Sequence, residues 1–264
     1  MKQRIITALI ALPLLILFLI NAGPVTFAGL VVVVATLALG EFYSMFLPTE
    51  RRGERLLAMA AGAGLTVLLC WQRPHLFEAG LTAAVLVFAL LFLFRYRDLA
   101  TVTTHLAAVC LGFLYLPLLL GHLALLRFLP FGRQWIFLVL VIVMVGDSVA
   151  YFVGSAFGRR RLYPAISPKK SIEGALGGLL GSILGALLCQ VIFFPQLTVV
   201  DCLLLGAGLG LLGQVGDLFE SMLKRATGVK DSGTMIPGHG GLLDRLDSLL
   251  FTFAPAYYYA IWVF

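Results

Sequence analysis

Charged residues are scarce in this sequence. Of its 264 residues only 12% are Asp, Glu, Lys or Arg, whereas 61% are hydrophobic, and the mean hydropathy is +1.02. A soluble domain usually carries about a quarter charged residues, which cover its water-facing surface. The apolar residues also form long uninterrupted runs, which a bilayer requires and a water-facing surface does not tolerate. The composition therefore excludes an ordinary soluble protein and predicts one that crosses a membrane several times.

Cysteine is also rare, and the four cysteines form no Cys-x-x-Cys pair. Zinc sites and disulfide frameworks need closely spaced or paired cysteines, so neither is indicated. The net charge of +6 is compatible with nucleic-acid binding. The basic residues, however, are distributed as membrane orientation requires, so we expect no nucleic-acid partner.

Nine segments are candidates for transmembrane helices, each bounded by proline, glycine or charged residues. A helix needs about 20 apolar residues to cross the hydrocarbon core. The candidates lie near residues 4–21, 24–46, 56–71, 76–94, 105–126, 134–157, 172–194, 199–223 and 246–264. The third is the shortest. The first follows Lys2 and Arg4, as in a signal peptide, but no small-x-small cleavage site follows it, so we expect an uncleaved helix.

The basic residues predict an orientation for these nine spans. All of the 19 Lys and Arg residues except Arg73, Arg127 and Arg133 fall on one side of the membrane. Cytoplasmic loops carry such an excess, so that side is the cytoplasm. The prediction is an all-α, polytopic helical bundle with its N-terminus inside and its C-terminus outside, in a bacterial cytoplasmic (inner) membrane.

The most polar parts of the chain lie in its second half. The loops 158–171 and 224–245 are the longest on the cytoplasmic side, so a polar substrate is expected to arrive from the cytoplasm. We expect residues 1–130 to form a scaffold of N-terminal helices with dimer contacts. Residues 131–264 are expected to form the catalytic region.

Two pairs of acidic residues flank the second of these loops. Asp217 and Glu220 are three residues apart, as are Asp244 and Asp247, a spacing that places both members on one face of a helix. A carboxylate at mid-bilayer costs about 2.5–3.5 kcal/mol, so such a residue usually has a partner or a function. Carboxylate oxygens are the ligands that Mg²⁺ prefers, which predicts a metal site. Alternatively, these acids form ion pairs at the helix ends with Lys224, Arg225 and Arg245.

The loop between the two pairs is rich in glycine. It contains Gly238, His239, Gly240 and Gly241. Glycine allows positive φ and close backbone approach, which suits backbone N–H groups that face a phosphate. Together with the basic residues and the paired acids, the loop predicts a phosphate-plus-metal site.

A second polar cluster lies upstream. Asp147 and Ser148 stand on the predicted span 134–157, whose small residues suit helix packing, although packing does not explain Asp147. Lys169 and Lys170 stand beside a Ser-Pro break that opens the next span. We expect these two lysines to bind nucleotide phosphates.

The sequence leaves two possible roles open for three arginines and for one glutamate. Arg159, Arg160 and Arg161 are either topology determinants or contacts to lipid headgroups. Glu41, near the inner end of the second span, is either functional or paired with Arg51.

The residues from Ser221 to Asp247 resemble the signature of the phosphatidate cytidylyltransferase (CDP-diacylglycerol synthase) family. The signature positions include Lys230-Asp231-Ser-Gly-Thr-Met-Ile-Pro-Gly-His239-Gly240-Gly241 and Asp244-Arg245-Leu-Asp247. The runs 146–151 and 167–174 are also similar to that family, with Ser171 where threonine is expected. The resemblance implies that CTP and phosphatidic acid react to give CDP-diacylglycerol and pyrophosphate, for phospholipid biosynthesis. It also implies a Mg²⁺-dependent, all-α, homodimeric membrane enzyme in which the C-terminal acids and Asp147 line the site.

We assign roles to individual residues within that reaction. Metal binding is expected of Asp217, Glu220, Asp244 and Asp247, with one or two ions, and Asp231 is expected to support the site. The catalytic group is predicted to be Asp217, Lys224, Asp231, His239, Asp244 and Asp247. Binding of CTP or lipid phosphate is predicted for Asp147, Ser148, Lys169, Lys170, Ser221, Arg225, Lys230, Gly240, Gly241 and Arg245.

Two rival functions follow from the same residues. A cation- or proton-coupled transporter also places acids in helices, but usually near the midplane and within repeated halves. A CDP-alcohol phosphatidyltransferase would carry an Asp-x-x-Asp-Gly-x-x-Ala-Arg run, which this sequence lacks. The resemblance and the crowding of acids around one loop favour the cytidylyltransferase.

Overall fold

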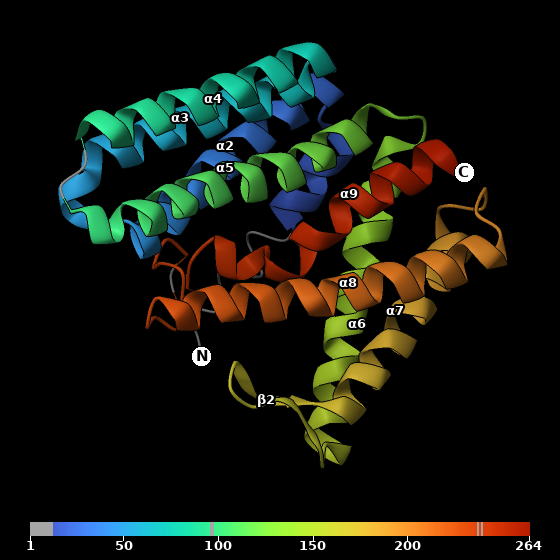
Figure 1. Ribbon diagram of the computed structural model, residues 1–264. Coiled ribbons are helices and arrows are strands. Elements are labelled where there is room, and N and C mark those ends of the chain that lie inside the picture. The colour runs from blue at the N-terminus through green and yellow to red at the C-terminus, as the bar shows by residue number, and fades with distance from the viewer. Residues whose placement is uncertain (1–12, 96–97, 237, 239) are drawn as a thin grey trace. The chain divides into compact units, whose positions relative to one another are not determined.

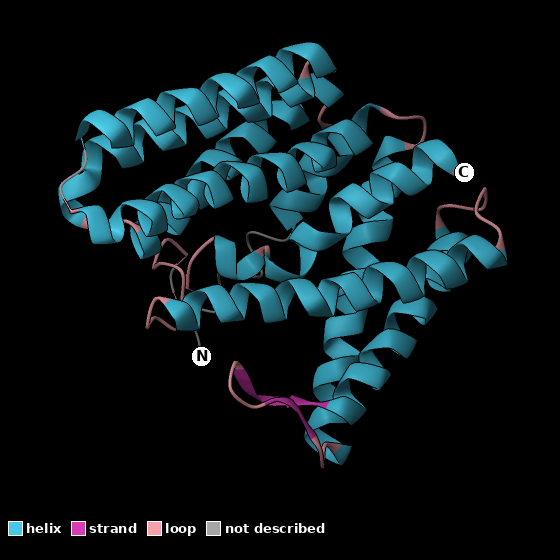
Figure 2. Cartoon of the chain, in the orientation of Figure 1, coloured by secondary structure: helices cyan, strands magenta, loops and turns pink. Residues whose placement is uncertain are grey.

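The computed structural model describes residues 13–95, 98–236, 238 and 240–264, and helices dominate it (Figures 1 and 2). The long helices are α2 (Pro24–Phe46), α3 (Arg52–Cys70), α4 (Pro74–Arg95), α5 (Leu99–Phe128), α6 (Gly132–Phe157), α7 (Ile172–Ile192), α8 (Val199–Ala226) and α9 (Asp247–Trp262). Two short 3₁₀ helices are η1 (Thr49–Arg51) and η2 (Leu243–Arg245). Residues 13–21 are also helical. The predicted all-α class is confirmed.

Within the described residues, seven helices are long and apolar enough to cross a bilayer. One of them covers the segment that the sequence predicted as a short third span, because η1 and α3 together run from Thr49 to Cys70 over 22 residues. The predicted first span lies partly outside the described residues, and α9, with 16 residues, is shorter than the other long helices. A multi-pass membrane protein is thus established, whereas nine spans and the inward N-terminus stay predictions.

A small sheet interrupts the helices where the sequence predicted only a loop. Strands β1 (Arg161–Tyr163) and β2 (Ser167–Ser171) pair in antiparallel register and form a hairpin between α6 and α7. Figure 2 shows it as the magenta element of the cartoon. The hairpin holds Lys169 and Lys170 in a strand, where neighbouring side chains point to opposite faces.

The chain folds as two compact units. Unit 1 consists of Met1–Leu125 with Asp231–Asp244, and unit 2 consists of Leu126–Lys230 with Arg245–Phe264. Unit 1 thus includes a segment that follows α8 in sequence. The division into a scaffold and a catalytic region at residue 130 stays a prediction.

Unit 1 has an aromatic core between its helices. Phe42, Tyr43 and Phe88 are fully buried, and the Tyr43 hydroxyl donates to the carbonyl oxygen of Val109 at 3.0 Å. This bond satisfies the one polar atom that Tyr43 brings into an apolar interior. It ties α2 to α5.

Unit 2 is built on close contacts of α7 with its neighbours. The small residues of α7 lie against α6, where the Ser182 hydroxyl donates to the Ile142 carbonyl oxygen at 3.1 Å. Helix α7 also meets α8 so closely that a Cβ at Gly206 would lie 2.5 Å from the Cα of Ile183. Small residues therefore allow the helices of unit 2 to pack closely.

This contact yields a prediction for stability. In Gly206→Ala the methyl group meets backbone atoms that cannot rotate away, so we expect the helices to separate and stability to fall by about 1–3 kcal/mol. Gly208→Ala is the matched control, because it lies on the same helix and its Cβ would meet nothing within 4 Å. Thermal unfolding in detergent should give a lower midpoint for Gly206→Ala than for Gly208→Ala. Equal midpoints would contradict close packing at Gly206.

Candidate active site

Three aspartates from distant parts of the sequence come together in unit 2. Asp147 stands on α6, Asp217 on α8, and Asp247 is the first residue of α9. The carboxylates of Asp147 and Asp247 each interact electrostatically with that of Asp217, and Ser248 hydrogen-bonds to Asp147. Three like charges at close range repel one another, so the cluster needs cations nearby.

The hairpin supplies one of these cations. The Lys170 ammonium lies 2.5 Å from a carboxylate oxygen of Asp217, and both side chains are about three-quarters covered. Lys169 points to the other side of β2 and is exposed. The two neighbouring lysines therefore have different surroundings, which the sequence did not distinguish.

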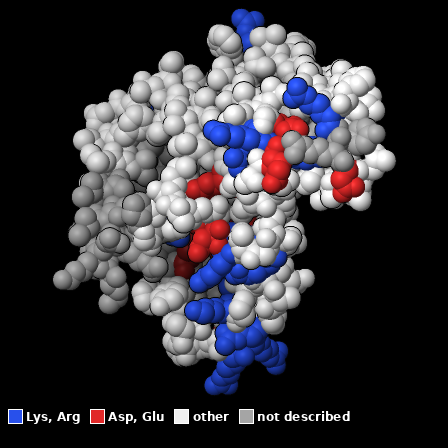
Figure 3. All heavy atoms as spheres, turned by 90° about the vertical axis from the view of Figure 1, so that its left-hand side faces the viewer, with Lys and Arg blue, Asp and Glu red and all other residues white. Residues whose placement is uncertain are grey.

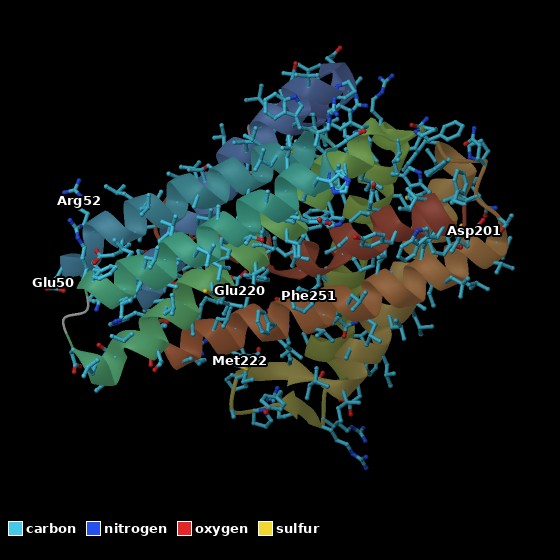
Figure 4. The ribbon with its side chains drawn as sticks, turned by 45° about the horizontal axis from the view of Figure 1, so that its top comes forward. Glu50, Arg52, Asp201, Glu220, Met222 and Phe251 are labelled. Atoms are coloured by element: carbon cyan, nitrogen blue, oxygen red, sulfur yellow. The ribbon has the colours of Figure 1, made fainter. Side chains whose placement is uncertain are left out.

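Lys224 supplies a second positive charge. It pairs with Glu220 at 3.1 Å, one turn away on α8, and it also interacts electrostatically with Asp247. Glu220 is fully buried, whereas Met222 is exposed, and Figure 4 shows the two side chains on opposite sides of α8. Glu220 therefore fits the predicted alternative in which acids pair with basic residues of the same helix.

Aromatic packing fixes α9 beside the acids of α8. The rings of Phe219 and Phe251 lie 5.3 Å apart between centroids, and Figure 4 labels Phe251. Two residues after Phe219, the Ser221 hydroxyl donates to Asp217 at 3.4 Å. The contact brings the start of α9, and with it Asp247, against the middle of α8.

A small hollow opens beside Asp147. Its lining residues come from α6, α7 and α8, and they are Val143, Gly146, Asp147, Ser182, Leu209, Gly210, Gly213 and Gln214. The Gln214 amide donates to the carbonyl oxygen of Ala175 at 3.0 Å, which satisfies this polar group inside the helix contact. Asp147 is the charged residue of this lining.

Basic side chains gather near the hairpin. Arg159, Arg160 and Arg161 are exposed, and Figure 3 shows blue side chains crowded at the level that the hairpin occupies in Figure 1. The backbone N–H groups of Arg159 and Arg160 donate to the carboxylate of Glu173. Glu173 thereby orders the start of the hairpin and leaves the guanidinium groups at the surface.

Asp244 lies in unit 1 and organises its own segment. One of its carboxylate oxygens accepts the N–H of Ser232 at 2.9 Å and that of Gly241 at 2.8 Å. The expectation that Asp244 and Asp247 share a helix face is wrong, because Asp244 belongs to η2 and α9 begins only at Asp247. The three-residue spacing spans a helix boundary, which spacing alone does not reveal.

Glu41, for which the sequence leaves open a functional role or a pair with Arg51, contacts a distant segment. Its carboxylate accepts three hydrogen bonds from the segment that contains Asp244, namely from Ser232, Leu242 and Leu243. It does not need Arg51, which pairs with Glu54 at 3.6 Å. A lone carboxylate in an apolar helix was the available signal.

The other predicted site residues lie at the surface or on turns. The φ angles of Gly238 and Gly240 are +76° and +84°, as the glycine-rich loop predicted. Ser148 donates to its own helix, and Arg225 donates to the Val229 carbonyl oxygen at 2.9 Å. Exposed positions are held by Lys230, Asp231 and Arg245. His239 lies outside the described residues.

The chemistry of the side chains in the aspartate cluster indicates which metal ion the cluster could bind. Among the described residues no three His, Cys, Asp or Glu side chains already form a metal-binding group. Asp147, Asp217 and Asp247 offer only carboxylate oxygens, which suit Mg²⁺ and its retained waters. The chemistry of these donors fits a magnesium ion, which stays a prediction.

Comparison with known proteins adds a full-length match. Residues 2–264 match the Cytidylyltransferase family. The chain belongs to this family. It is 35% identical to the phosphatidate cytidylyltransferase of Bacillus subtilis, over 98% of this chain and 97% of that protein. It is 37% identical to the Pseudomonas aeruginosa protein of the same name, over 94% of this chain and 93% of that protein.

Membership of this family confirms the resemblance that the C-terminal motifs carried. The Thermotoga maritima phosphatidate cytidylyltransferase is also 35% identical, over 98% of this chain and 95% of that protein. The match covers the N-terminal helices, which carried no motif in the sequence. The comparisons give no support to the transporter alternative.

Proposed function

We propose that this protein transfers CMP from CTP to phosphatidic acid, giving CDP-diacylglycerol and pyrophosphate. The observation that carries the proposal is the full-length similarity to curated phosphatidate cytidylyltransferases. The cluster of aspartates and lysines in unit 2 supports it, because a reaction between two polyanions needs groups of both kinds.

In the proposed reaction the phosphate of phosphatidic acid attacks the α-phosphorus of CTP. A new P–O bond forms, the bond from the α-phosphorus to the bridging oxygen breaks, and pyrophosphate leaves with that electron pair. The attacking phosphate is already an anion, so no strong base is needed. What the protein must supply is orientation and positive charge.

The residues of unit 2 can meet these needs. Lys170 and Lys224 bring two ammonium groups to the aspartate cluster. Asp147, Asp217 and Asp247 would hold magnesium, which, when bound, neutralises phosphate charge and orients the leaving group. A cation held by Asp217 would compete with Lys170 for that carboxylate, and the Lys170 ammonium could then bind a phosphate oxygen.

An assay of both substrates tests the proposal. The full-length protein in detergent, supplied with CTP, phosphatidic acid and Mg²⁺, should release pyrophosphate. Omitting phosphatidic acid or adding excess EDTA should stop the release. Substrate-dependent flux in liposomes without CTP, combined with no pyrophosphate release, would favour a transporter instead.

We also propose that the protein is a homodimer. A separate proposal concerns its topology: the hairpin faces the cytoplasm of a bacterial inner membrane. In a cysteine-free variant, Lys169→Cys should react with an impermeant maleimide in inside-out vesicles and stay unlabelled in right-side-out vesicles. Arg73→Cys, at the predicted outer surface, is the matched control and should show the opposite pattern. Equal labelling of both positions from one side would contradict the predicted topology.

A further inference from the structure

Glu41 is the charged residue of α2, a helix otherwise made of apolar and small polar side chains. Only 7% of its surface is exposed. A carboxylate buried in this way is costly unless strong donors surround it. The groups that donate hydrogen bonds to the Glu41 carboxylate therefore indicate its role.

Three donors from one distant segment, Asp231–Asp244, reach Glu41 in the part of the chain that the structure describes. One carboxylate oxygen accepts the backbone N–H of Leu242 at 2.9 Å. The other accepts the Ser232 hydroxyl and the backbone N–H of Leu243, both at 2.9 Å. These bonds join both ends of the segment to one side chain on α2.

The segment is shaped for this contact. A Cβ at Gly233 would lie 2.7 Å from one Glu41 oxygen, and a Cβ at Gly241 would collide with the other oxygen and with the Ser232 hydroxyl. Glycine at these two positions lets the backbone reach the carboxylate. Asp244 adds a second carboxylate that accepts the N–H groups of Ser232 and Gly241.

The segment is also tied by the chain to the helices that carry the aspartate cluster. It follows α8, which ends at Ala226, and it precedes α9, which begins at Asp247. Its conformation therefore constrains the chain directly before Asp247.

We propose that Glu41 is a positioning residue for the cytidylyl transfer. Its carboxylate holds the segment Asp231–Asp244 in the conformation that turnover requires, although α2 belongs to the N-terminal half of the chain. This inference rests on the proposed function only in naming the reaction that the segment serves. The holding of the segment stands on the contacts themselves.

The choice of glutamate over glutamine follows from the donors. Three donors face the two oxygens, so both oxygens must accept. Glutamine has one oxygen and one NH₂ group, and whichever way the amide turns, its NH₂ group faces a donor. Glu41→Gln keeps the shape of the side chain and removes at least one of the three bonds.

The experiment compares Glu41→Gln with a matched buried acid in the full-length protein. We expect kcat for pyrophosphate release to fall about 10- to 100-fold, as when a buried donor loses its acceptor. Hydrogen–deuterium exchange of peptides covering Leu242 and Leu243 should become faster, with little change in the rest of unit 1. Glu54→Gln is the control, since Glu54 is 8% exposed and forms an ion pair with Arg51.

Ser232→Ala gives an independent variant, because it removes the hydroxyl donor and leaves Glu41 in place. It should lower kcat less than Glu41→Gln, and the double variant should lose less than the product of the two single losses. If Glu41→Gln fails to fold, the exchange and turnover of Ser232→Ala still test whether the contact with Glu41 holds the segment. Normal turnover and normal exchange in Ser232→Ala would then overturn the proposal.

Several results would overturn this role for Glu41. Unchanged exchange in Glu41→Gln, whatever its activity, would show that Glu41 does not hold the segment. Equal loss of turnover in Glu41→Gln and Glu54→Gln would reveal a general effect of buried acids. A wild-type protein without turnover would count against the proposed function alone, because the exchange comparison would still test the contact.

Discussion

Replacing Asp217 with asparagine is expected to reduce CTP-dependent pyrophosphate release by about 1,000-fold or more, a loss at the upper end of what one electrostatic group contributes. Asp217 interacts electrostatically with Asp147 and Asp247, and it forms the ion pair with Lys170. Asparagine keeps the size and loses the charge that would hold a cation. The variant should remain folded, because it relieves repulsion from two neighbouring carboxylates.

The matched control is Asp201→Asn on the same helix. Asp201 lies at the opposite end of α8 from Glu220, as Figure 4 shows, and its carboxylate accepts from Thr198 and from the Tyr259 hydroxyl. Its role there is to cap the helix, which asparagine can partly fulfil. We expect turnover within about threefold of the wild type, since capping changes stability by only about 1 kcal/mol. Normal turnover in Asp217→Asn would remove Asp217 from the active site.

Two substitutions of Asp244 should separate two functions of one carboxylate. Asp244→Ala removes the acceptor for the Ser232 and Gly241 N–H groups, so both the loop conformation and turnover should be lost. Asp244→Asn keeps a carbonyl oxygen for these two donors but has no charge for a metal. We expect it to keep slow amide exchange at Gly241 while turnover falls about 100-fold or more if Asp244 is the Mg²⁺ ligand that the sequence predicts, because the variant would lack that carboxylate.

The comparison of the two Asp244 variants has a clear contrary outcome. If Asp244→Asn turns over like the wild type, the carboxylate acts only as a hydrogen-bond acceptor within unit 1. Asp244 then leaves the predicted metal set, and the proposed donors Asp147, Asp217 and Asp247 are unaffected. Exchange and activity must therefore be measured on the same preparations.

Helix positions in the second half of the chain could be predicted closely from the sequence. The predicted spans 134–157 and 199–223 correspond to α6 and α8, because long apolar runs with clear polar ends leave little choice in a bilayer. The third span was predicted too short because its helix continues through charged residues. The predicted span begins after the charged residues, whereas α3 includes Arg52, Glu54 and Arg55.

The contacts that build the site were less accessible to sequence reasoning. Glu41 and Leu243 are separated by 202 positions, and no local pattern shows that they meet. Lys170 was predicted to bind phosphate, but its pairing with Asp217 depends on a hairpin whose five-residue strand contains proline and two lysines. Such a strand has weak propensity, and its neighbouring helices stabilise it.

The position of isotope in the products tests the central claim most directly. With CTP labelled at the α-phosphorus, the full-length protein in detergent with phosphatidic acid and Mg²⁺ should transfer the label into an organic-soluble lipid. With CTP labelled at the γ-phosphorus, the label should stay in the aqueous phase as pyrophosphate, in equal molar amount. Label from the γ-phosphorus in the lipid, or no lipid product from active, folded protein, would contradict cytidylyl transfer.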